Sequence, residues 1–458
     1  MSEVIIRDDL EAMAESGLLS DYNRRRLTAA RPTDGAMLAL NINLTAICNL
    51  GCTYCFAKGG DYGRITGKLN EGADVESILQ FVKQNAARGE TVRFEFFGGE
   101  PMINFSTIEA LCWRSEALGA EQGIRFLYRI STNLTMRLTE RELELFARFR
   151  FTVSVSIDGS EATHDRNRPN KAGRGSFRAI LDNCYKVRER SDDITLVARM
   201  TYVPHPDSSL VADVEALYAF NIFDWFQILP ATVSRELVRT VFADAFGDLA
   251  YSEICRLCAD KVDSEYKLLG EIYMLLFRPG NRFRGVLEIE TVIRMLLEGE
   301  VANGHCSGGR NYFTFSPDHS IMPCHRLVGE AEFRVGAFGG TIDGEAVAPW
   351  RLGINDTPVC RDCAIRYICG GGCKQENFVA TADINRPDPE KCRFQFRLVH
   401  CAIQAIAESD AAFRARRRGV LRDLFVSCGR PTLSSGRSEE VPAPDRLTHL
   451  IPLLHAFD

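Results

Sequence analysis

The chain has 458 residues, of which 45% are hydrophobic and 25% charged, an ordinary globular composition that excludes a disordered or collagen-like protein. Its formal net charge of −6 argues against broad nucleic-acid binding, which needs a basic surface. No segment approaches the ~20 consecutive apolar residues that span a bilayer. The acidic N-terminus also lacks the pattern of a secretory signal, so we expect a cytoplasmic protein that binds neither nucleic acid nor a membrane.

The first part of the chain predicts an α/β fold. Residues 1–36 are charged and predict one or two short helices. Short β-rich runs then alternate with amphipathic helical segments, and this alternation is typical of parallel strands covered by helices. The predicted strands are 37–44, 93–97, 126–131, 151–157, 194–203 and 225–229, and helices are predicted at 75–88, 139–149 and 176–188. Six such units fit a partial (β/α)6 TIM-like barrel over residues 37–240, with its chemistry at the C-terminal strand ends.

The second part of the chain has a different character. Residues 241–302 predict a helical connector. In residues 303–400 glycine and cysteine dominate and regular periodicity fades, which favours a cysteine-rich domain held by metal more than by a large core. Residues 401–458 predict a helix over 401–426 and then a flexible tail that contains GRPTLSSGRSEEVPAPD.

Sixteen cysteines are an unusual number for such a chain. A disulfide framework is typical of small secreted proteins, so clustered cysteines here indicate metal ligands. Three cysteines lie close together near the N-terminus, seven lie between residues 306 and 392, and six are scattered: Cys112, Cys184, Cys255, Cys258, Cys401 and Cys428.

The first group has the spacing Cys48-x3-Cys52-x2-Cys55 and directly follows the first predicted strand. Three thiolates can hold three irons of a 4Fe–4S cluster and leave the fourth iron open. The alternatives are a zinc site that lacks a fourth ligand, or buried core cysteines.

With Tyr54 inside it, this spacing resembles the motif of the radical S-adenosylmethionine (SAM) enzymes. In that family the open iron is chelated by SAM, and an electron from the cluster releases a 5′-deoxyadenosyl radical that abstracts a hydrogen atom. The resemblance implies a SAM-binding 4Fe–4S cluster on Cys48, Cys52 and Cys55, with the hard chemistry supplied by the cofactor.

Residues at later strand ends extend the resemblance. Gly98, Gly99 and Glu100 are similar to the family's GGEP motif, which contacts the SAM amino group. Asn133 ends the third strand, and Ser156 ends the fourth, twelve residues before Arg168. In the similar sulfatase-maturing enzymes a Ser and an Arg at that spacing hold the SAM ribose and carboxylate. Taken singly, Ser156 fits a polar strand cap and Arg168 a surface charge.

The second cysteine group contains Cys306, Cys324, Cys360, Cys363, Cys369, Cys373 and Cys392. Seven thiolates can serve two four-iron clusters, one of them with an open position, or a pair of zinc-ribbon sites. The pattern resembles the SPASM domain, an auxiliary-cluster extension of radical SAM peptide-modifying enzymes. The resemblance implies a distal cluster on Cys360, Cys363, Cys369 and Cys392, and a proximal cluster on Cys306, Cys324 and Cys373.

Two positions depart from the patterns of relatives. His319 stands where the SPASM pattern has a glycine, and residues 290–305 lack the further cysteine that sulfatase maturases carry. The proximal cluster is therefore expected to keep an open iron, able to bind a substrate thiolate, unless His305, His319 or His325 fills it.

Local sequence favours a peptide maturase. Residues 55–63, 164–169 and 323–326 resemble thioether-forming maturases of ribosomally made peptides. His325 stands where sulfatase maturases carry the Asp that serves as their base, which makes His325 a candidate catalytic residue and disfavours formylglycine formation.

Three hypotheses follow. The first is a radical enzyme that installs a thioether or a carbon–carbon crosslink in a ribosomally made peptide. The second is a sulfatase-maturase-like enzyme that oxidises Cys or Ser to formylglycine, and the third is a zinc or iron–sulfur interaction protein without catalysis. The enzymatic hypotheses require a precursor peptide or protein substrate, and reduced flavodoxin or ferredoxin as electron donor. Only 47 residues precede Cys48, which is short for the leader-binding module of many thioether-forming relatives. We therefore expect that a separate leader-binding protein or another surface of the enzyme recognises the leader, or that the substrate is recognised near its modified core.

Overall fold

The computed structural model describes residues 30–32, 37–298, 301–414 and 432–435. The helices predicted before residue 30, the thiol of Cys428 and most of the predicted tail lie outside these residues. Within the described part of the chain no helix is long and apolar enough to cross a membrane.

Six parallel strands form the centre of the molecule, and their order in the sheet is their order in the chain. They are β2 (Leu38–Asn43), β3 (Thr91–Phe97), β4 (Arg125–Thr132), β5 (Thr152–Ser156), β6 (Thr195–Tyr202) and β7 (Trp225–Pro230). Each matches a predicted strand to within two residues at either end, which confirms the partial barrel.

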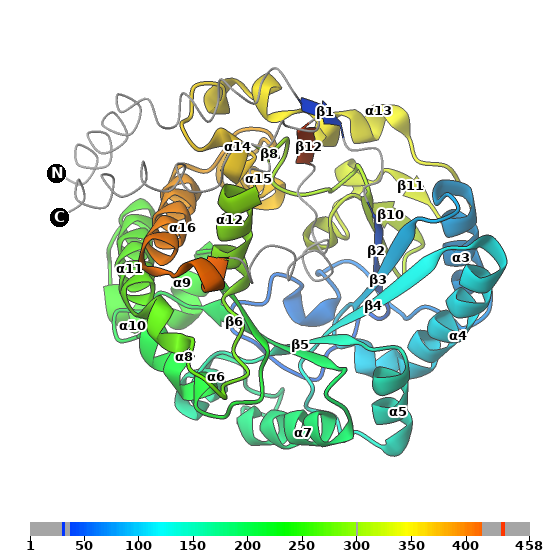
Figure 1. Cartoon of the computed structure of the whole chain (residues 1–458), viewed down its shortest axis with the longest axis horizontal. Coiled ribbons are helices and arrows are strands. Elements are labelled where there is room, and N and C mark those ends of the chain that lie inside the picture. The colour runs from blue at the N-terminus through cyan, green and yellow to red at the C-terminus, as the bar shows by residue number, and fades with distance from the viewer. Residues whose placement is uncertain (1–29, 33–36, 299–300, 415–431, 436–458) are drawn as a thin grey trace.

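The two faces of the sheet differ because side chains alternate along a strand. In β3, Val92, Phe94 and Phe96 are fully buried under the outer helices, whereas Arg93 and Glu95 point to the inner face and form an ion pair (Nη2–Oε1 2.8 Å). The outer helices are α3 (Ala73–Asn85), α4 (Phe105–Gln122), α5 (Glu140–Arg148), α6 (Glu161–Asn167), α7 (Phe177–Arg190) and α8 (Leu210–Tyr218) (Figure 1). The predicted helices at 75–88, 139–149 and 176–188 are confirmed as α3, α5 and α7.

The cysteine-rich region continues the barrel sheet, which the sequence did not predict. β9 (Tyr312–Phe315) pairs in parallel with β2, and β10 (Ser320–Met322) and β11 (Gly336–Ala337) follow in antiparallel order to complete nine strands. Phe313 and Phe315 pack against Phe81 of α3, with ring centroids 5.8 and 5.1 Å apart. This part of the region therefore shares the core of the barrel and does not depend on metal alone.

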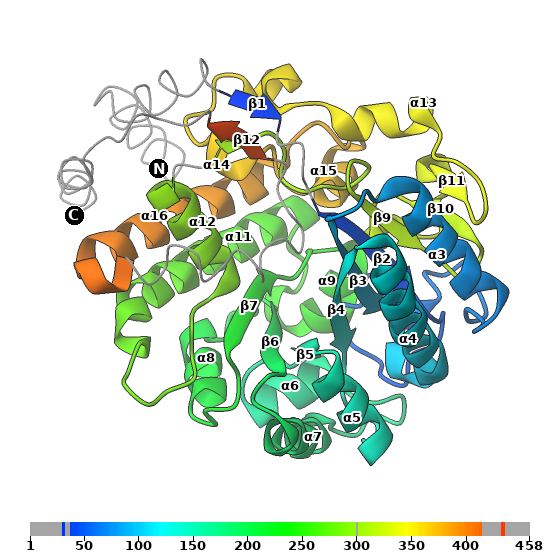
Figure 2. The ribbon, with the colours of Figure 1, turned by 45° about the vertical axis from the view of Figure 1, so that its right-hand side comes forward.

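The connector and the C-terminal region supply three long helices that lie side by side: α11 (Tyr251–Ile272), α12 (Leu287–Glu298) and α16 (Pro389–Glu408) (Figure 2). The boundary predicted at residue 400 falls inside α16. Shorter helices are α9 (Arg235–Val241), α10 (Ala243–Phe246), α13 (Gly344–Val347), α14 (Arg366–Cys369) and α15 (Lys374–Thr381).

A second, small sheet joins distant parts of the chain. β12 (Thr432–Ser435) pairs in antiparallel fashion with β1 (Ala30–Pro32) on one side and with β8 (Val301–Ala302) on the other. Residues 432–435 belong to the segment predicted as a flexible tail, and for them that prediction is wrong. Backbone pairing with two other segments gives them an extended structure that composition does not reveal.

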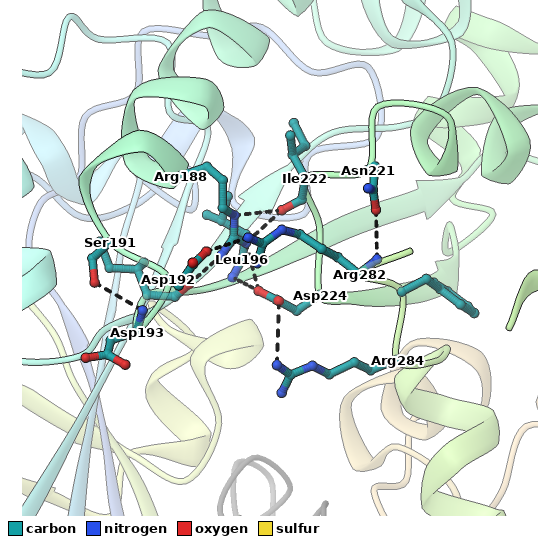
Figure 3. A network of polar contacts seen from close by, with 12 residues as sticks. Arg188, Ser191, Asp192, Asp193, Leu196, Asn221, Ile222, Asp224, Arg282 and Arg284 are labelled. Atoms are coloured by element: carbon teal, nitrogen blue, oxygen red, sulfur yellow. Dashed lines mark hydrogen bonds and ion pairs between the residues drawn. The ribbon is translucent and has the colours of Figure 1, made fainter. Parts of the chain in front are cut away.

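The N-terminal ends of β6 and β7 are held by a buried polar network (Figure 3). Asp224 accepts hydrogen bonds from the Arg188 guanidinium and from the Leu196 amide, both at 2.8 Å. Arg188 also donates to the Ile222 carbonyl, so that α7 is tied to two strands at once. This network lies at the end of the strands opposite to the predicted chemistry and serves the stability of the barrel.

Candidate active site

One cavity of about 1080 Å³ opens at the C-terminal ends of the strands and contains most of the predicted site. Its walls include inward-facing strand residues such as Ser131, Arg199 and Gln227. The predicted residues that line it are Cys48, Cys52, Tyr54, Cys55, Gly98, Gly99, Glu100, Asn133, Ser156, Arg168, Cys306, Cys324, His325 and Cys373. The four cysteines assigned to the distal cluster are not among its lining residues.

The first cysteine group lies in the loop after β2, where its thiols are close to one another. Burial raises the pKa of Cys52 to about 12, with Cys55 and Cys48 adding to the rise and Arg168 opposing it. Backbone amides point at the sulfurs: Leu50 N lies 3.5 Å from Cys48 Sγ, and Gly59 N lies 3.4 Å from Cys55 Sγ. Such amides stabilise charge on cluster sulfurs, so this loop is built for thiolate ligands.

Gly98 and Gly99 let two segments of backbone run side by side. Gly99 N donates to the Thr45 carbonyl and Glu100 N to the Ile47 carbonyl, both at 2.8 Å. A Cβ atom on Gly99 would lie 2.2 Å from the Ile47 oxygen, so any side chain there would collide with the backbone that leads into Cys48. The resemblance assigned the two glycines to the close approach of a ligand. The structure shows that they also allow the backbone of the cysteine loop to pack closely against them.

Glu100 is buried, and no cation of the described residues forms an ion pair with it. Its carboxylate accepts hydrogen bonds from Thr132 Oγ1 (2.5 Å), Asn133 N (2.7 Å) and Met102 N (3.1 Å). Burial raises its pKa to about 7, although these three donors oppose the rise. Asn133 also places its side-chain amide 3.7 Å from Cys48 Sγ. A buried carboxylate that lines the cavity beside the cysteine loop is suited to a cationic ligand group.

Arg168 is held by Asp158, a residue that the sequence analysis did not single out. Arg168 Nε and Nη2 each lie 2.9 Å from one oxygen of the Asp158 carboxylate. The Tyr54 hydroxyl donates to the same carboxylate, and the Arg168 guanidinium lies over the Tyr54 ring at 5.2 Å. Arg168 was expected to bind the carboxylate of SAM, but in this structure its fork binds Asp158. The arrangement fixes Arg168 and Tyr54 beside Cys52.

His325 lies between the two cysteine-bearing parts of the cavity, in an aromatic cluster. Its ring is 4.9 Å from Phe97 and 5.9 Å from Phe56, and Nδ1 lies 2.9 Å from the Tyr312 hydroxyl. Burial holds the pKa of His325 well below its usual range, and nearby guanidinium groups, of which Arg199 has the largest effect, lower it further. His325 is therefore a neutral imidazole inside the cavity.

The second cysteine group separates into the two sets that the sequence predicted. Cys324 lies with Cys306 and Cys373: burial raises its pKa and both neighbouring thiols raise it further. Burial likewise raises the pKa of Cys392 to about 12, with further increases from Cys369, Cys363 and Cys360. Among the described residues, no three His, Cys, Asp or Glu side chains are close enough to share a single metal ion.

The three histidines considered for the proximal set have different positions. His319 is 60% exposed and pairs with Asp74, 3.1 Å away, so it does not reach the set. Its backbone is left-handed (φ 59°), which explains why related sequences use glycine at this turn. His305 lines the cavity and its Nδ1 lies 3.0 Å from the Cys369 carbonyl, and His325 lines the same cavity.

Several lining residues were missed because their signal is weak in a sequence. Arg199 lies on the inner face of β6, with Nη1 3.0 Å from Ser131 Oγ. In the sequence its only signal as a site residue is that a charged residue stands inside an apolar strand. Glu288 at the start of α12 accepts from Ile228 N at 3.0 Å, and burial raises its pKa to about 7. The other missed residues lie far apart in the sequence and come together at the cavity only in the folded structure: Phe56, Arg326 and Glu376.

Comparison with known proteins identifies the domain that carries the first cysteine group. Residues 42–217, which contain the first cysteine group and the strand-end residues up to Arg168, match the radical SAM superfamily. These residues form a radical SAM domain. Two curated relatives of the chain are a serine-type anaerobic sulfatase-maturating enzyme of Klebsiella aerogenes (22% identical over 71% of this chain and 76% of the relative) and the PqqA peptide cyclase of Rhodopseudomonas palustris (25% identical over 83% and 92%).

Solved structures support the same fold. The chain superposes on native anSMEcpe with bound AdoMet with a TM-score of 0.61, at 18% identity and over 81% of this chain and 98% of that one. It superposes on Streptococcus suis SuiB bound to its precursor peptide SuiA with a TM-score of 0.50, at 17% identity and over 81% and 77%. Residues 42–217 thus make the chain an enzyme with a radical SAM domain, whose cofactors are a 4Fe–4S cluster and SAM, and the relatives of the chain include a sulfatase-maturating enzyme and a peptide cyclase.

Proposed function

We propose that this enzyme installs a thioether or a carbon–carbon crosslink in a ribosomally made peptide. The observation that carries the proposal is that two sets of cysteines face the same cavity: Cys48, Cys52 and Cys55 on one wall, and Cys306, Cys324 and Cys373 on another. A volume of about 1080 Å³ exceeds that of ordinary small-molecule sites, which leaves room for a peptide beside a cofactor.

The donor groups of the first wall fit the superfamily's cofactors. Cys48, Cys52 and Cys55 would hold the SAM-binding cluster, and the buried carboxylate of Glu100, with Asn133 beside it, would receive the amino group of SAM. Ser156 and Arg168 would line the part of the cavity that receives the ribose and the carboxylate of SAM, and Asp158 holds Arg168 in place there. When bound, these cofactors supply the radical that removes a hydrogen atom from the substrate.

The second wall would hold the substrate sulfur. Three cysteines in the proximal set leave one coordination position of a four-iron cluster for a substrate thiolate, while Cys360, Cys363, Cys369 and Cys392 would hold the distal cluster. His325 lies in the same cavity and would accept the proton that the substrate thiol loses when its sulfur binds the open position; the hydrogen on carbon leaves as an atom, and the cluster would accept the one electron released when the new bond forms. Holding both reacting groups in one cavity reduces the entropic barrier to bond formation.

A second candidate is the oxidation of Cys or Ser to formylglycine. It is favoured by the relatives that are serine-type and cysteine-type sulfatase-maturating enzymes. His325 disfavours this second candidate, because the resemblance places at this position the aspartate that serves as the base of sulfatase maturases.

The proposal is tested with anaerobically reconstituted enzyme, SAM, dithionite and Cys-containing peptides translated from the short open reading frames that flank its gene. A crosslink removes two hydrogen atoms and keeps every sulfur, whereas formylglycine formed from Cys loses sulfur, and formylglycine formed from Ser reacts with an aldehyde probe. Mass spectrometry of the product should show loss of two hydrogens, retained sulfur and no aldehyde. An aldehyde in the product would replace the proposal by the second candidate.

A further inference from the structure

Three charged side chains that line the cavity form ion pairs with one another close to the second cysteine group. Glu376 of α15 accepts from Arg326 Nη1 at 3.3 Å and from Lys391 Nζ at 3.2 Å. The side chains are only 15% to 21% exposed, and all three line the cavity. We call Arg326, Glu376 and Lys391 the ion-pair bridge.

The bridge is also anchored to the barrel. Arg326 Nη2 donates to Thr232 Oγ1 at 2.9 Å, and Thr232 Oγ1 donates to Glu376 Oε1 at 3.4 Å. Thr232 lies two residues after the end of β7, so the bridge joins the end of a barrel strand to the cysteine-rich region. The guanidinium of Arg326 further lies over the ring of Phe56 at 5.3 Å.

Each member of the bridge lies beside a different cysteine segment. Arg326 is two residues after Cys324, Glu376 is three residues after Cys373, and Lys391 directly precedes Cys392. Phe56, on which Arg326 is stacked, directly follows Cys55. One chain of contacts therefore links the first, the proximal and the distal cysteine sets.

The charges of the bridge do not cancel. Two cations and one carboxylate give the three residues of the bridge a net charge of about +1 in a buried place, where charges interact more strongly than in water, and Asp388, whose pKa burial raises, is the acid beside Lys391. The backbone amide of Arg326 lies 3.4 Å from Cys324 Sγ, and both Arg326 and Glu376 shift the pKa of Cys373, so these two members of the bridge act on the proximal set. Added electrons on a cluster are stabilised by nearby positive charge, and cluster potentials depend on net charge and hydrogen bonds.

We propose that the ion-pair bridge sets the reduction potential of the proximal cluster, with Arg326, Glu376 and Lys391 acting as positioning residues. The inference rests on the proposed function, because it requires that Cys306, Cys324 and Cys373 hold a cluster. Glu376 is the central member because, within the part of the chain that the structure describes, it is the acid that pairs with both cations. The net positive charge raises the potential and so favours electron transfer to this cluster.

The test compares two variants that change the charge in opposite directions. Glu376→Gln keeps the shape of the side chain and makes the bridge more positive, whereas Lys391→Met makes it neutral. An anaerobic redox titration followed by electron paramagnetic resonance should show one auxiliary signal at a higher potential in E376Q and at a lower potential in K391M. Glu345→Gln, an exposed acid in the same region, is the matched control and should leave every potential unchanged.

Opposite shifts distinguish a charge effect from damage to the fold, which would move both variants in the same direction. Unchanged potentials in E376Q and K391M, or shifts in the same direction, would overturn the inference. Iron and sulfide analysis of the wild-type holoenzyme separates this failure from that of the proposed function. Iron for a single cluster would refute the proposed auxiliary sites, whereas iron for three clusters with unshifted potentials would refute only the role of the bridge.

Discussion

Replacing Gly99 by alanine tests whether the close approach of two backbones holds the cofactor loop. The new Cβ would lie 2.2 Å from the Ile47 carbonyl oxygen and 2.9 Å from Cys48 N. Ordinary contact between such atoms requires ~3.5 Å, so the two segments must separate by roughly 1 Å. The colliding atoms belong to the backbone and cannot rotate away, so Cys48 itself has to move.

Two magnitudes follow for Gly99→Ala. Overpacking of this kind costs about 1–3 kcal/mol of stability. A displacement of roughly 1 Å in a positioned catalytic group reduces the rate by about a hundredfold. The hydrogen bond from Glu100 N to the Ile47 carbonyl, 2.8 Å long, would be strained by the same movement. We therefore expect a folded protein with little iron in the first site and strongly reduced cleavage of SAM.

The matched control is Gly51→Ala, in the same loop. Its Cβ would lie 3.8 Å from the Pro169 carbonyl oxygen and 3.9 Å from that of Asn170, which are ordinary contacts. Both variants are reconstituted anaerobically, and their iron content and 5′-deoxyadenosine production from SAM and dithionite are measured. Wild-type iron and cleavage in G99A would refute the reasoning, as would an equal loss in G51A.

Three further predictions concern the first cysteine group and the stability of the barrel. Changing Cys48, Cys52 and Cys55 together to alanine should abolish 5′-deoxyadenosine production and leave the auxiliary iron bound, and equal production by wild type and variant would contradict it. Asp224→Ala leaves the buried Arg188 charge without its carboxylate and should lower the free energy of unfolding by about 3–5 kcal/mol in chemical denaturation. The control is Arg284→Ala, because Arg284 is exposed and lies 4.0 Å from Asp224; this change should lower the free energy of unfolding by at most about 1 kcal/mol. Burial lowers the pKa of His164 from 6.5 to about 4, so the unfolded chain takes up a proton before the folded chain as pH falls. The stability that His164 contributes is therefore present above pH 6.5, and about 3 kcal/mol of it is lost by pH 4. Unfolding curves at the two pH values should show this loss for the wild type and should not show it for His164→Gln.

The barrel could be predicted because its strands carry a local signal. Short β-rich runs, each followed by a helical segment, mark the strands, and such runs depend only on residues that are close together in the sequence. The cysteine spacing and the glycine motif likewise depend on residues close together in sequence, and the structure gathers Cys48, Gly99 and Glu100 around one cavity as expected.

Residues that act through distant contacts could not be predicted in this way. Asp158 was visible at a strand end, but its binding of Arg168 and Tyr54 depends on how two loops approach each other. The pairing of β9 with β2 joins strands about 270 residues apart, which no local pattern reveals. Glu376 carries no motif at all, and its importance follows only from the two cations that surround it.

The continuous sheet changes what removal of iron should do to the cysteine-rich region. The part that carries β9 is held by pairing with β2 and by packing of Phe313 and Phe315 on the barrel core, neither of which needs metal. The segment over residues 354–369 has helical pieces of only three or four residues. Ile354, Cys360 and Tyr367 form a small separate apolar cluster with Val301, and Ile365, Ile368 and Cys369 reach the main core. Metal ligation should therefore supply much of its folding free energy.

Hydrogen exchange followed by mass spectrometry can separate these two parts of the region. After anaerobic chelation of iron, amides in residues 354–369 should exchange much faster than in the reconstituted enzyme, while amides of β9 should keep their protection. Because β9 belongs to the nine-stranded sheet, it can open only together with the barrel edge. If β9 and residues 354–369 lose protection together, the region folds as one metal-dependent unit, and the core shared with the barrel does not stabilise β9. If neither loses protection, the apolar cluster around Ile354 is sufficient without metal.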